Sequence, residues 1–486
     1  METPEYHWAM PGTIEADGCG ASASPRSNLS RLRSTKRSAE AVTGLWHRCR
    51  SSPARQGVAV TATVALWIAS AVTWSLVCLR LARTDTNLGW DLVTSYRAER
   101  VFARGGQPYS IAATDHRLYL YPPSALLVLR PLALLSLHQV QLLGLAATAV
   151  MMWAAVMISA AVLGMRWWGF TAAVVVFALR FAEPLVAELG LENVTVVCTL
   201  ALALFYLLSA REHWVLAGAA IGLTLAIKPL LVAVLLVFVL GRKWRALAVA
   251  VAIPAVLNIA AFVVVRDSTA VFAKLPSLLD RTGTGALLNS AWVDVMASLG
   301  APHAVTILVR VLTVGVVALG AWWSWQEMAD GPTRTITTSS VLLMGTYLAG
   351  TLSENHFMLT LVPLAMTAVV TGAPARWVSA WVGVLLFMGL TPPGSLLGLG
   401  SAANLSLFRA LGMTLVVLTV VAALGSKRFS HKSKRATQRD TGSSRWLPAG
   451  AGKSSAAAAP ASTDGKQEDA DRATAGAGPL EGMLAP

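Results

Sequence analysis

The sequence predicts an all-α polytopic membrane protein with about twelve transmembrane helices. Its mean hydropathy is +0.59, and only 13% of its 486 residues are charged. Apolar runs of about 20 residues, the length that crosses a bilayer core, recur along the chain. The net charge of +14 comes from basic residues that cluster outside these runs. This placement follows the positive-inside rule and argues against a nucleic-acid partner.

Polar tails are expected on both sides of one transmembrane domain. Residues 1–56 and 426–486 are rich in Ser, Ala, Gly and charged residues and have no apolar periodicity. Such segments cannot bury enough apolar surface to offset the entropy of ordering. We therefore expect disordered cytoplasmic tails around a transmembrane domain over 57–425.

Twelve full spans are predicted within this domain. They lie at 57–81, 119–137, 139–164, 191–210, 213–227, 229–241, 246–265, 304–325, 336–352, 357–371, 377–391 and 404–425. Basic residues at 242–245 and 427–428 mark the cytoplasmic side. Both termini are then cytoplasmic, and the outer loops are 82–118, 187–192, 266–303, 353–356 and 392–403.

The segment 167–188 does not fit as a full span. A complete crossing would place Arg211 outside, against the charge rule, and Arg180, Glu183 and Glu188 make its second half a poor lipid-facing helix. Broken backbone is tolerated where protein or water surrounds it. The expectation is a half-membrane hairpin that enters and leaves on the outer side.

The first outer loop carries a carboxylate at the membrane surface. Asp91 lies in GWDLVTSYRAERVFARGG, where Leu92, Tyr96 and Phe102 recur at near-helical spacing. This pattern predicts a short amphipathic helix at the interface. Asp91 at its start is either an N-cap or a chemically active base, and the residue alone leaves both interpretations open.

Lys228 and Pro229 interrupt an apolar hairpin. Proline ends or kinks a helix, and an ammonium at this depth is costly unless it is paired or faces water. Lys228 is therefore either a snorkelling anchor or a contact for an anionic phosphate.

A second polar group lies between two apolar runs, at Ser353-Glu354-Asn355-His356. A plain turn uses such residues, but an imidazole at a cavity mouth can also donate to a phosphate or steer a proton.

These motifs in order resemble the polyprenyl-phosphate-dependent membrane glycosyltransferases with the GT-C fold, of the family 87 (DUF2029) type. The resemblance lies in Asp91 before Tyr-Arg-Ala, Gly-Gly-x-Pro-Tyr at 105–109, Leu-Tyr-Pro-Pro at 120–123, Gly-Leu-Thr-Leu-Ala-Ile-Lys-Pro at 222–229, Arg-Lys-Trp-Arg-Ala-Leu at 242–247 and Asn289-Ser290. It covers 57–425, and the stretch 214–290 is most similar to the arabinofuranosyltransferases that branch arabinan. Two motifs depart from the family pattern: Gly190-Leu191-Glu192-Asn193 replaces Gly-Gln-x-Asn, and the late His motif lacks its usual Trp.

The resemblance implies a role for ten residues. Asp91 would be the catalytic base, and Lys228 and His356 would bind the donor phosphate. The substrate-binding residues would be Tyr96, Arg97, Tyr119, Tyr121, Asn193, Asn289 and Glu354. No metal or other cofactor is expected, since a phosphate monoester leaving group needs less help than a diphosphate, and the four scattered cysteines have no metal-site spacing.

The implied reaction moves an arabinofuranosyl residue, with inversion, from decaprenyl-phospho-arabinose to an arabinan or glycolipid acceptor, giving the α-1,3 branches of arabinogalactan or lipoarabinomannan. The enzyme would lie among membrane lipids of the plasma membrane, with its active site on the periplasmic face. Two alternatives stay open: a polyprenyl-phosphomannose-dependent mannosyltransferase of the same fold, and a lipid-linked sugar transporter. A transporter should show internal repeats, which the sequence lacks.

Overall fold

The structure is a computed structural model that describes residues 53–84, 88–110, 119–273, 289–389 and 401–443. Within these ranges every regular element is a helix, which confirms the predicted all-α class. The chain divides into two units, Met1–Ser430 and His431–Pro486, and the site lies in the first. The last helix, α18 (Ser401–Ser443), continues past residue 425. Most of both predicted tails lies outside the described residues, and their disorder stays a prediction.

Five helices of the described part are long and apolar enough to cross a membrane, or six if a bent pair is one span. They are α2 (Pro53–Thr84), α5 (Leu137–Val162), α11 (Trp244–Val264), α14 (His303–Glu327) and α18. Each coincides with a predicted span, so the membrane character of the chain is confirmed. The number of spans beyond these helices stays a prediction.

Shorter helices occupy most of the other predicted spans. They are α8 (Thr195–Ala210), α9 (Trp214–Ile227), η3 (Pro229–Val234) with α10 (Leu235–Leu240), α15 (Pro332–Ala349), η4 (Asn355–Leu361) with α16 (Val362–Met366) and η5 (Thr367–Val369), and α17 (Val378–Phe387). Smaller elements connect them: η1 (Pro108–Ser110), α13 (Trp292–Ser298) and η6 (Pro374–Arg376).

The predicted span at 119–137 is wrong. This segment forms two short helices, α4 (Pro123–Val128) and η2 (Arg130–Leu134). Proline lacks the amide donor of a helix interior and restricts the residue before it, so Pro123 can only begin α4 and Pro131 lies at the start of the next turn. Ser136 then caps α5 with a capping box, which starts a new helix.

The segment predicted as a hairpin is broken. It forms α6 (Phe170–Leu179) and α7 (Glu183–Leu191), which are bent by 67° relative to each other. A bend of this size fits either a broken span or a re-entrant segment, so the faces on which it enters and leaves stay a prediction.

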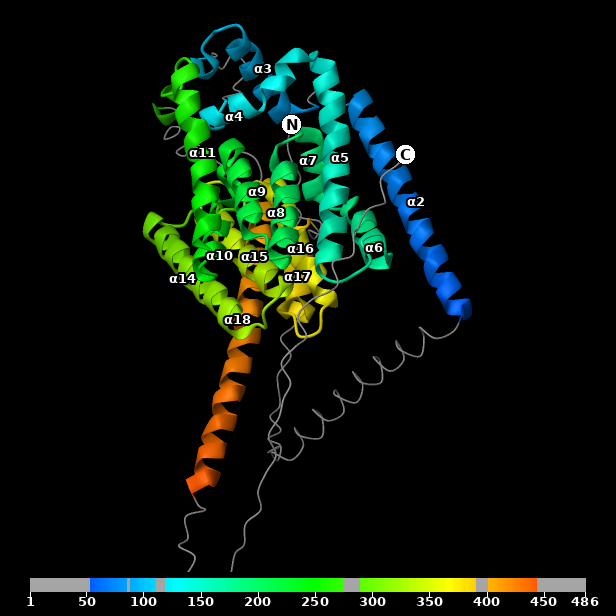
Figure 1. Cartoon of the computed structure of the whole chain (residues 1–486), viewed down its shortest axis with the longest axis vertical. Helices are drawn as coiled ribbons and strands as arrows, with labels where there is room; N and C mark the ends of the chain where they lie inside the picture. The colour runs from blue at the N-terminus through cyan, green and yellow to red at the C-terminus, as the bar shows by residue number, and fades with distance from the viewer. Residues whose placement is uncertain (1–52, 85–87, 111–118, 274–288, 390–400, 444–486) are drawn as a thin grey trace, which may run out of the picture. The chain divides into compact units, whose positions relative to one another are not determined.

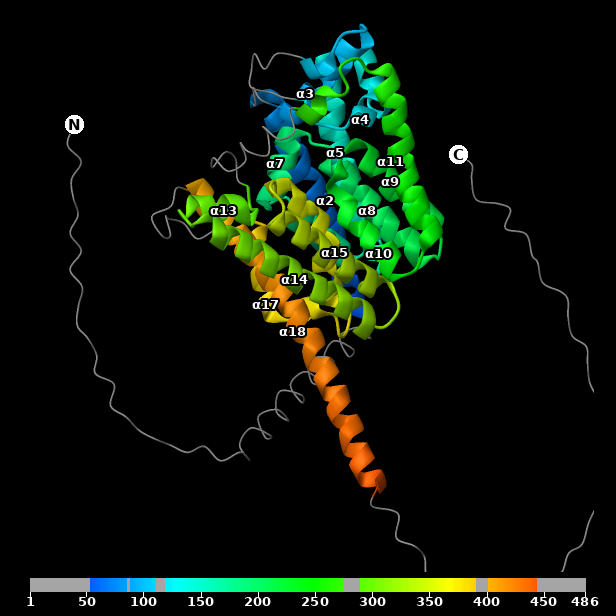
Figure 2. The ribbon, with the colours of Figure 1, turned by 90° about the vertical axis from the view of Figure 1, so that its left-hand side faces the viewer.

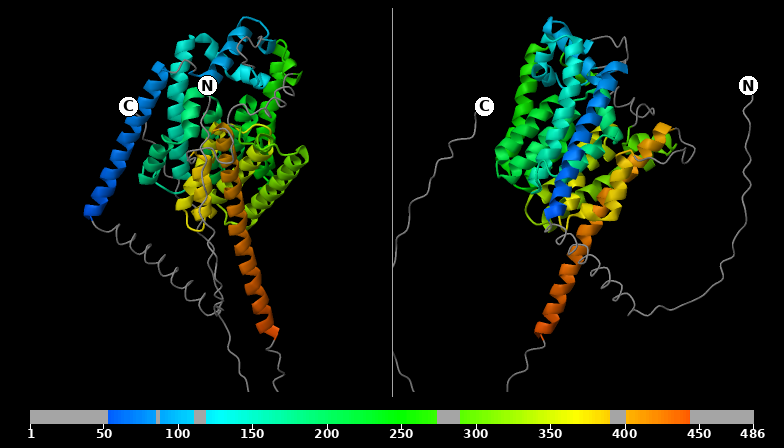
Figure 3. Two further views of the ribbon diagram at one scale, coloured as in Figure 1. Left: turned by 180° about the vertical axis from the view of Figure 1, so that it is seen from behind. Right: turned by 90° about the vertical axis from the view of Figure 1, so that its right-hand side faces the viewer.

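Two long and two shorter helices form one packed row beside the site. In Figure 1, α5, α8, α9 and α11 lie side by side, and α3 (Trp90–Ala103) and α4 lie at one end of them. On another side α14 lies against α15 and α18 (Figure 2). Figure 3 shows α2 at the margin of the unit, where it packs mainly on α6.

Two glycines bring α9 and α11 together. A Cβ atom at Gly218 would lie 2.3 Å from the carbonyl oxygen of Ala246, and one at Gly222 would lie 2.9 Å from that of Ala250. Small residues permit this backbone approach, which is typical of helix pairs in membranes. The pair holds the end of α9, where Lys228 lies.

We expect Gly218→Ala to destabilise the protein by about 1–3 kcal/mol, because the new methyl group meets main-chain atoms that cannot rotate away. The measurement is the melting temperature of the purified protein in detergent. Gly315→Ala is the matched control, since nothing lies within 4 Å of a Cβ at Gly315 on α14. Equal melting temperatures for the two variants would contradict the close α9–α11 contact.

Candidate functional site

A glycine turn sets the start of α3 and therefore the place of Asp91. Gly89 precedes the helix in the left-handed conformation (φ 69°) and donates its amide to the Gly190 carbonyl at 2.8 Å. A Cβ at Gly89 would lie 2.9 Å from a carboxylate oxygen of Glu192. Both the backbone angle and the space thus require glycine here.

Asp91 lies in the first turn of α3, as the sequence predicts, but it does not cap the helix. No side-chain cap is present, and one carboxylate oxygen instead accepts a hydrogen bond of 2.6 Å from Asn193 Nδ2. The capping interpretation of Asp91 is therefore wrong, and its carboxylate belongs to a side-chain network.

Asn193 joins this carboxylate to a lysine. Its Oδ1 accepts from Lys228 Nζ at 2.9 Å, and from the backbone N and the hydroxyl of Thr195 at 3.0 and 2.9 Å. Since a lysine ammonium only donates and a carboxylate only accepts, the amide can have just one orientation between them. Asn193 also satisfies an amide at the start of α8, so it serves the fold as well as the site.

Lys228 ends α9 with extended backbone (φ −147°, ψ 124°), the conformation that the following proline favours. Its ammonium bonds to the neutral oxygens of Asn193 and Thr195 and lies 4.4 Å from the ring centre of Phe357. Within the described residues no carboxylate forms an ion pair with it. Its positive charge is therefore available to an anionic ligand.

Glu354 and His356 form the other polar group of the site. Nε2 of the buried His356 lies 3.2 Å from a carboxylate oxygen of Glu354. Burial alone would raise the pKa of Glu354, but the adjacent His356 and the charge of Lys228 outweigh it and lower this pKa to about 2. Glu354 is thus a carboxylate at neutral pH, and it lies within electrostatic range of the Lys228 ammonium.

Asp91 responds to all of these neighbours. Burial raises its pKa, and the negative charge of Glu354 raises it further. The hydrogen bond from Asn193 and the charges of His356 and Lys228 lower it, without cancelling the rise. A carboxylate of raised pKa accepts a proton more readily than an ordinary aspartate.

The remaining predicted residues lie around this cluster with different contacts. The pKa of Tyr121 is raised, by burial and then by Asp91 and Glu354, which places it beside the site. The Tyr119 ring lies 5.7 Å from the Tyr121 ring. Asn289 accepts the Ser353 amide at 2.7 Å and so supports the loop of Glu354.

Two further predicted residues, Tyr96 and Arg97, lie on α3. Tyr96 is buried and donates its hydroxyl to the carbonyl of Leu135 at 3.0 Å, while Arg97 is exposed on the same helix. Their roles in substrate binding stay predictions.

Sequence reasoning left Glu188 and Arg409 out of the site. Glu188 is fully buried, accepts the Val196 amide at 3.1 Å and lies within electrostatic range of Asp91. Arg409 is fully buried on α18 and pairs with Glu183. The signal for both was an ionisable residue inside an apolar run, which has to find a partner.

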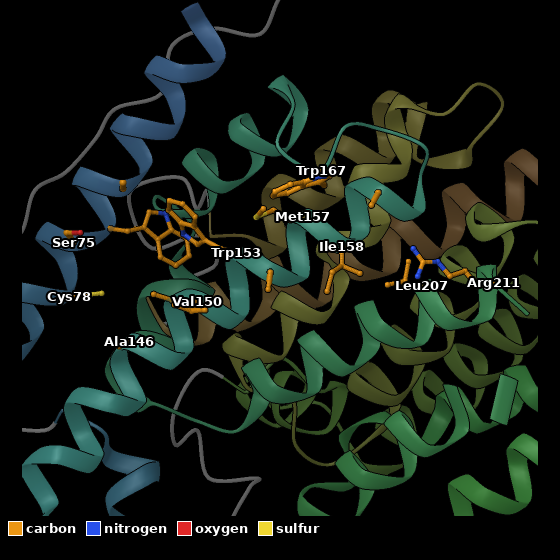
Figure 4. A pocket seen from close by; sticks show the side chains of 15 residues that line it. Ser75, Cys78, Ala146, Val150, Trp153, Met157, Ile158, Trp167, Leu207 and Arg211 are labelled. Carbon is orange, nitrogen blue, oxygen red and sulfur yellow. The ribbon is translucent and has the colours of Figure 1, made fainter. Parts of the chain in front are cut away.

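A separate apolar groove of about 840 Å³ lies between α2, α5 and the end of α8. Trp74, Trp153 and Trp167 line it together with small and branched apolar residues. Figure 4 shows the lining along α5, with Ala146 and Arg211 at opposite ends. It contains none of the polar residues of the cluster, and its shape and lining suit an apolar chain.

The cluster can support one kind of chemistry. Asp91 can take a proton from a hydroxyl, and Lys228 and His356 can stabilise negative charge that develops on a leaving phosphate. When a hydroxyl attacks a carbon attached to phosphate, the proton acceptor is needed on the side of the hydroxyl and the phosphate-binding groups on the opposite side of that carbon.

Comparison with known proteins gives consistent matches. The model of "Glycosyltransferase family 87" matches residues 119–353. The chain is 32% identical over 353 residues to the alpha-(1->3)-arabinofuranosyltransferase of Mycobacterium tuberculosis, covering 69% of this chain and 79% of that relative. The proteins of the same name from Mycolicibacterium smegmatis and Corynebacterium glutamicum are 29% and 25% identical, with 76% and 78% of their lengths covered. No solved structure matches.

The second carboxyl group of α3 gives a prediction on stability. Glu99 is fully buried, and neither of its oxygens has a hydrogen-bond partner in the described residues. Burial raises its pKa from 4.5 to about 8, against the lowering effect of Arg130. Between these pH values the folded state holds a proton that the unfolded state has released, so the free energy of unfolding falls as the pH rises.

Glu99→Gln cannot ionise, so its melting temperature should fall less than that of the parent between pH 4.5 and about 8. The measurement is thermal unfolding of both proteins in detergent over this range. Parallel pH profiles would show that Glu99 is not protonated in the folded state.

Proposed function

Since this chain belongs to glycosyltransferase family 87, we propose that it transfers an arabinofuranosyl residue from decaprenyl-phospho-arabinofuranose to an arabinan acceptor. The new linkage is α-1,3, the anomeric configuration inverts, and the product is a branch of arabinogalactan or lipoarabinomannan. The name shared by the relatives supports the sugar and the linkage. Membership of an enzyme family removes the transporter alternative.

The chain of Asp91, Asn193 and Lys228 is the observation that carries this proposal. The acceptor hydroxyl gives its proton to Asp91 while its oxygen attacks the anomeric carbon from the face opposite the phosphate. The bond between this carbon and the phosphate oxygen breaks, and its electron pair leaves with the polyprenyl phosphate. Lys228 and His356 stabilise the departing charge.

The proposed reaction uses no divalent metal. A polyprenyl monophosphate is already ionised at neutral pH and leaves as a phosphate. Lys228, whose ammonium bonds to neutral oxygens, and the nearby imidazole of His356 supply donors to it. Their hydrogen bonds to an anion are of the strong, charge-assisted kind.

A lipid-linked donor agrees with the apolar groove. A polyprenyl chain is apolar along its whole length, and the groove follows α5 from Ala146 to Ala161 between α2 and the end of α8. The basic residues at 242–245 and 427–428 support a plasma-membrane topology with cytoplasmic termini and the Asp91 side facing the periplasm.

The direct test offers purified protein radiolabelled decaprenyl-phospho-arabinofuranose and decaprenyl-phospho-mannose side by side, with an arabinan acceptor. We expect transfer from the arabinose donor, and Asp91→Asn should reduce kcat by about 10²–10⁴-fold because the amide cannot accept a proton. Donor affinity should stay close to that of the parent.

The control for this variant is Asp330→Asn, which removes an exposed carboxylate that pairs with Arg334. It should leave kcat unchanged. Transfer from the mannose donor alone would replace the proposed sugar, and a folded, donor-binding Asp91→Asn protein with parental kcat would exclude Asp91 as the base.

Lys228→Ala should weaken binding of decaprenyl phosphate by about 10- to 100-fold, the loss expected for a hydrogen bond to a charged group. Lys228→Arg retains the charge and should lose less affinity, although a planar guanidinium places its donors differently from an ammonium. Binding is measured by titration of the purified proteins. Lys243→Ala is the control, since Lys243 is a cation that pairs with exposed Glu212. If both alanine variants bind equally well, Lys228 is only an interfacial anchor.

A further inference from the structure

Three side chains from distant parts of the chain form a closed triangle, in which Arg409 and Asn355 are buried and Glu183 is partly exposed. Arg409 on α18 has no exposed surface, and its Nη1 donates to Asn355 Oδ1 at 2.9 Å. Its Nη2 forms an ion pair with Glu183. The amide of Asn355 donates to the second oxygen of the same carboxylate. Each member therefore bonds to both of the others.

Glu183 connects the triangle to the proton-accepting part of the site. It is the first residue of α7, and this helix ends at Leu191, two residues before Asn193. Asn193 holds the carboxylate of Asp91. A shift of Glu183 would therefore move the short, rigid helix that presents the partner of Asp91.

Asn355 connects the triangle to the phosphate-binding part. Asn355 lies between Glu354 and His356 at the start of η4. Phe357, which follows His356, has its ring against the ammonium of Lys228. Asn289 and Ser290 fix the other side of this loop through the backbone of Ser353, but no bond from them reaches His356. The hydrogen bonds of the Asn355 side chain to Glu183 and Arg409 thus hold the backbone next to the imidazole.

We propose that Arg409 is a positioning residue for the transfer reaction: its guanidinium sets the distance between the α7 segment that carries Asn193 and the η4 segment that carries His356. The predicted loss of activity rests on the proposed function, whereas the predicted change in the structure does not. Arg409 has no exposed surface with which to contact a substrate, and it acts through Glu183 and Asn355.

The chemistry of the side chain explains why an arginine is needed. A guanidinium presents two Nη groups in a fixed plane, so it can hold a carboxylate and an amide oxygen at a defined separation. A lysine keeps the charge but has one nitrogen on a flexible stem. Burying the guanidinium costs desolvation energy that offsets much of its attraction to the partly exposed Glu183, so the pair contributes little net stability. Fixed geometry is then the main gain from this pair.

The test compares Arg409→Lys with Arg428→Lys. Arg428 lies on the same helix and pairs with Glu327 at 3.4 Å, away from the site. We expect Arg409→Lys to lower kcat by about 10²-fold, the effect of displacing a catalytic group by about 1 Å. The donor Kd and the melting temperature should change little. Arg428→Lys should keep the parental kcat.

Hydrogen exchange measures the positioning without any substrate. In Arg409→Lys, the segments 183–193 and 353–361 should exchange faster than in the parent, while α9 and α11 keep their protection. In Arg428→Lys no segment near the site should change. If Arg409→Lys does not fold, the double variant Arg409→Met/Glu183→Met, which replaces the pair by apolar side chains, is measured in its place.

The outcomes separate the inference from the function. Parental kcat, or unchanged exchange in both segments, would overturn the role of Arg409. A loss of kcat together with a general loss of protection would reduce Arg409 to a stabilising residue and overturn it as well. If the parent transfers no arabinose, the proposed function fails, and the exchange result alone decides whether Arg409 positions the two segments.

Discussion

The candidate site depends on one neutral side chain between two charges. If Lys228 paired directly with Asp91, the pair would lower the pKa of the aspartate and occupy the ammonium, and both would lose their reactivity. The amide of Asn193 bonds to each and keeps them apart. The glycine turn before α3, the end of α7, the start of α8 and the proline-terminated end of α9 all converge on this amide.

Local chemistry was readable from the sequence, and several predictions based on it are confirmed. The helix that carries Asp91 and the break at Lys228 and Pro229 both follow from signals within a few residues. The prediction of one span over 119–137 was wrong because it followed the apolar composition of the segment and not its prolines. Composition indicates what a segment can be buried in, whereas Pro123 and Pro131 decide whether it forms one helix.

The partners of the buried charges could not be predicted in the same way. Arg409 and Glu183 are 226 residues apart, and no spacing or periodicity connects them. A sequence shows that an arginine in an apolar run needs a partner, but only the packing of α18 against the broken span shows which one. The bond from the Tyr96 hydroxyl to the Leu135 carbonyl could not be predicted either, because the two residues are 39 positions apart.

The hydrogen bond from Asn193 also makes the two oxygens of Asp91 different from each other. One oxygen is held by the amide, and the other has no hydrogen bond within the described residues. The carboxylate cannot rotate freely, so an incoming alcohol meets a lone pair of fixed direction. For the proposed arabinan acceptor, regioselectivity then becomes a matter of alignment: among the similar hydroxyls of a furanose ring, the proposed reaction selects the one whose proton points along that direction.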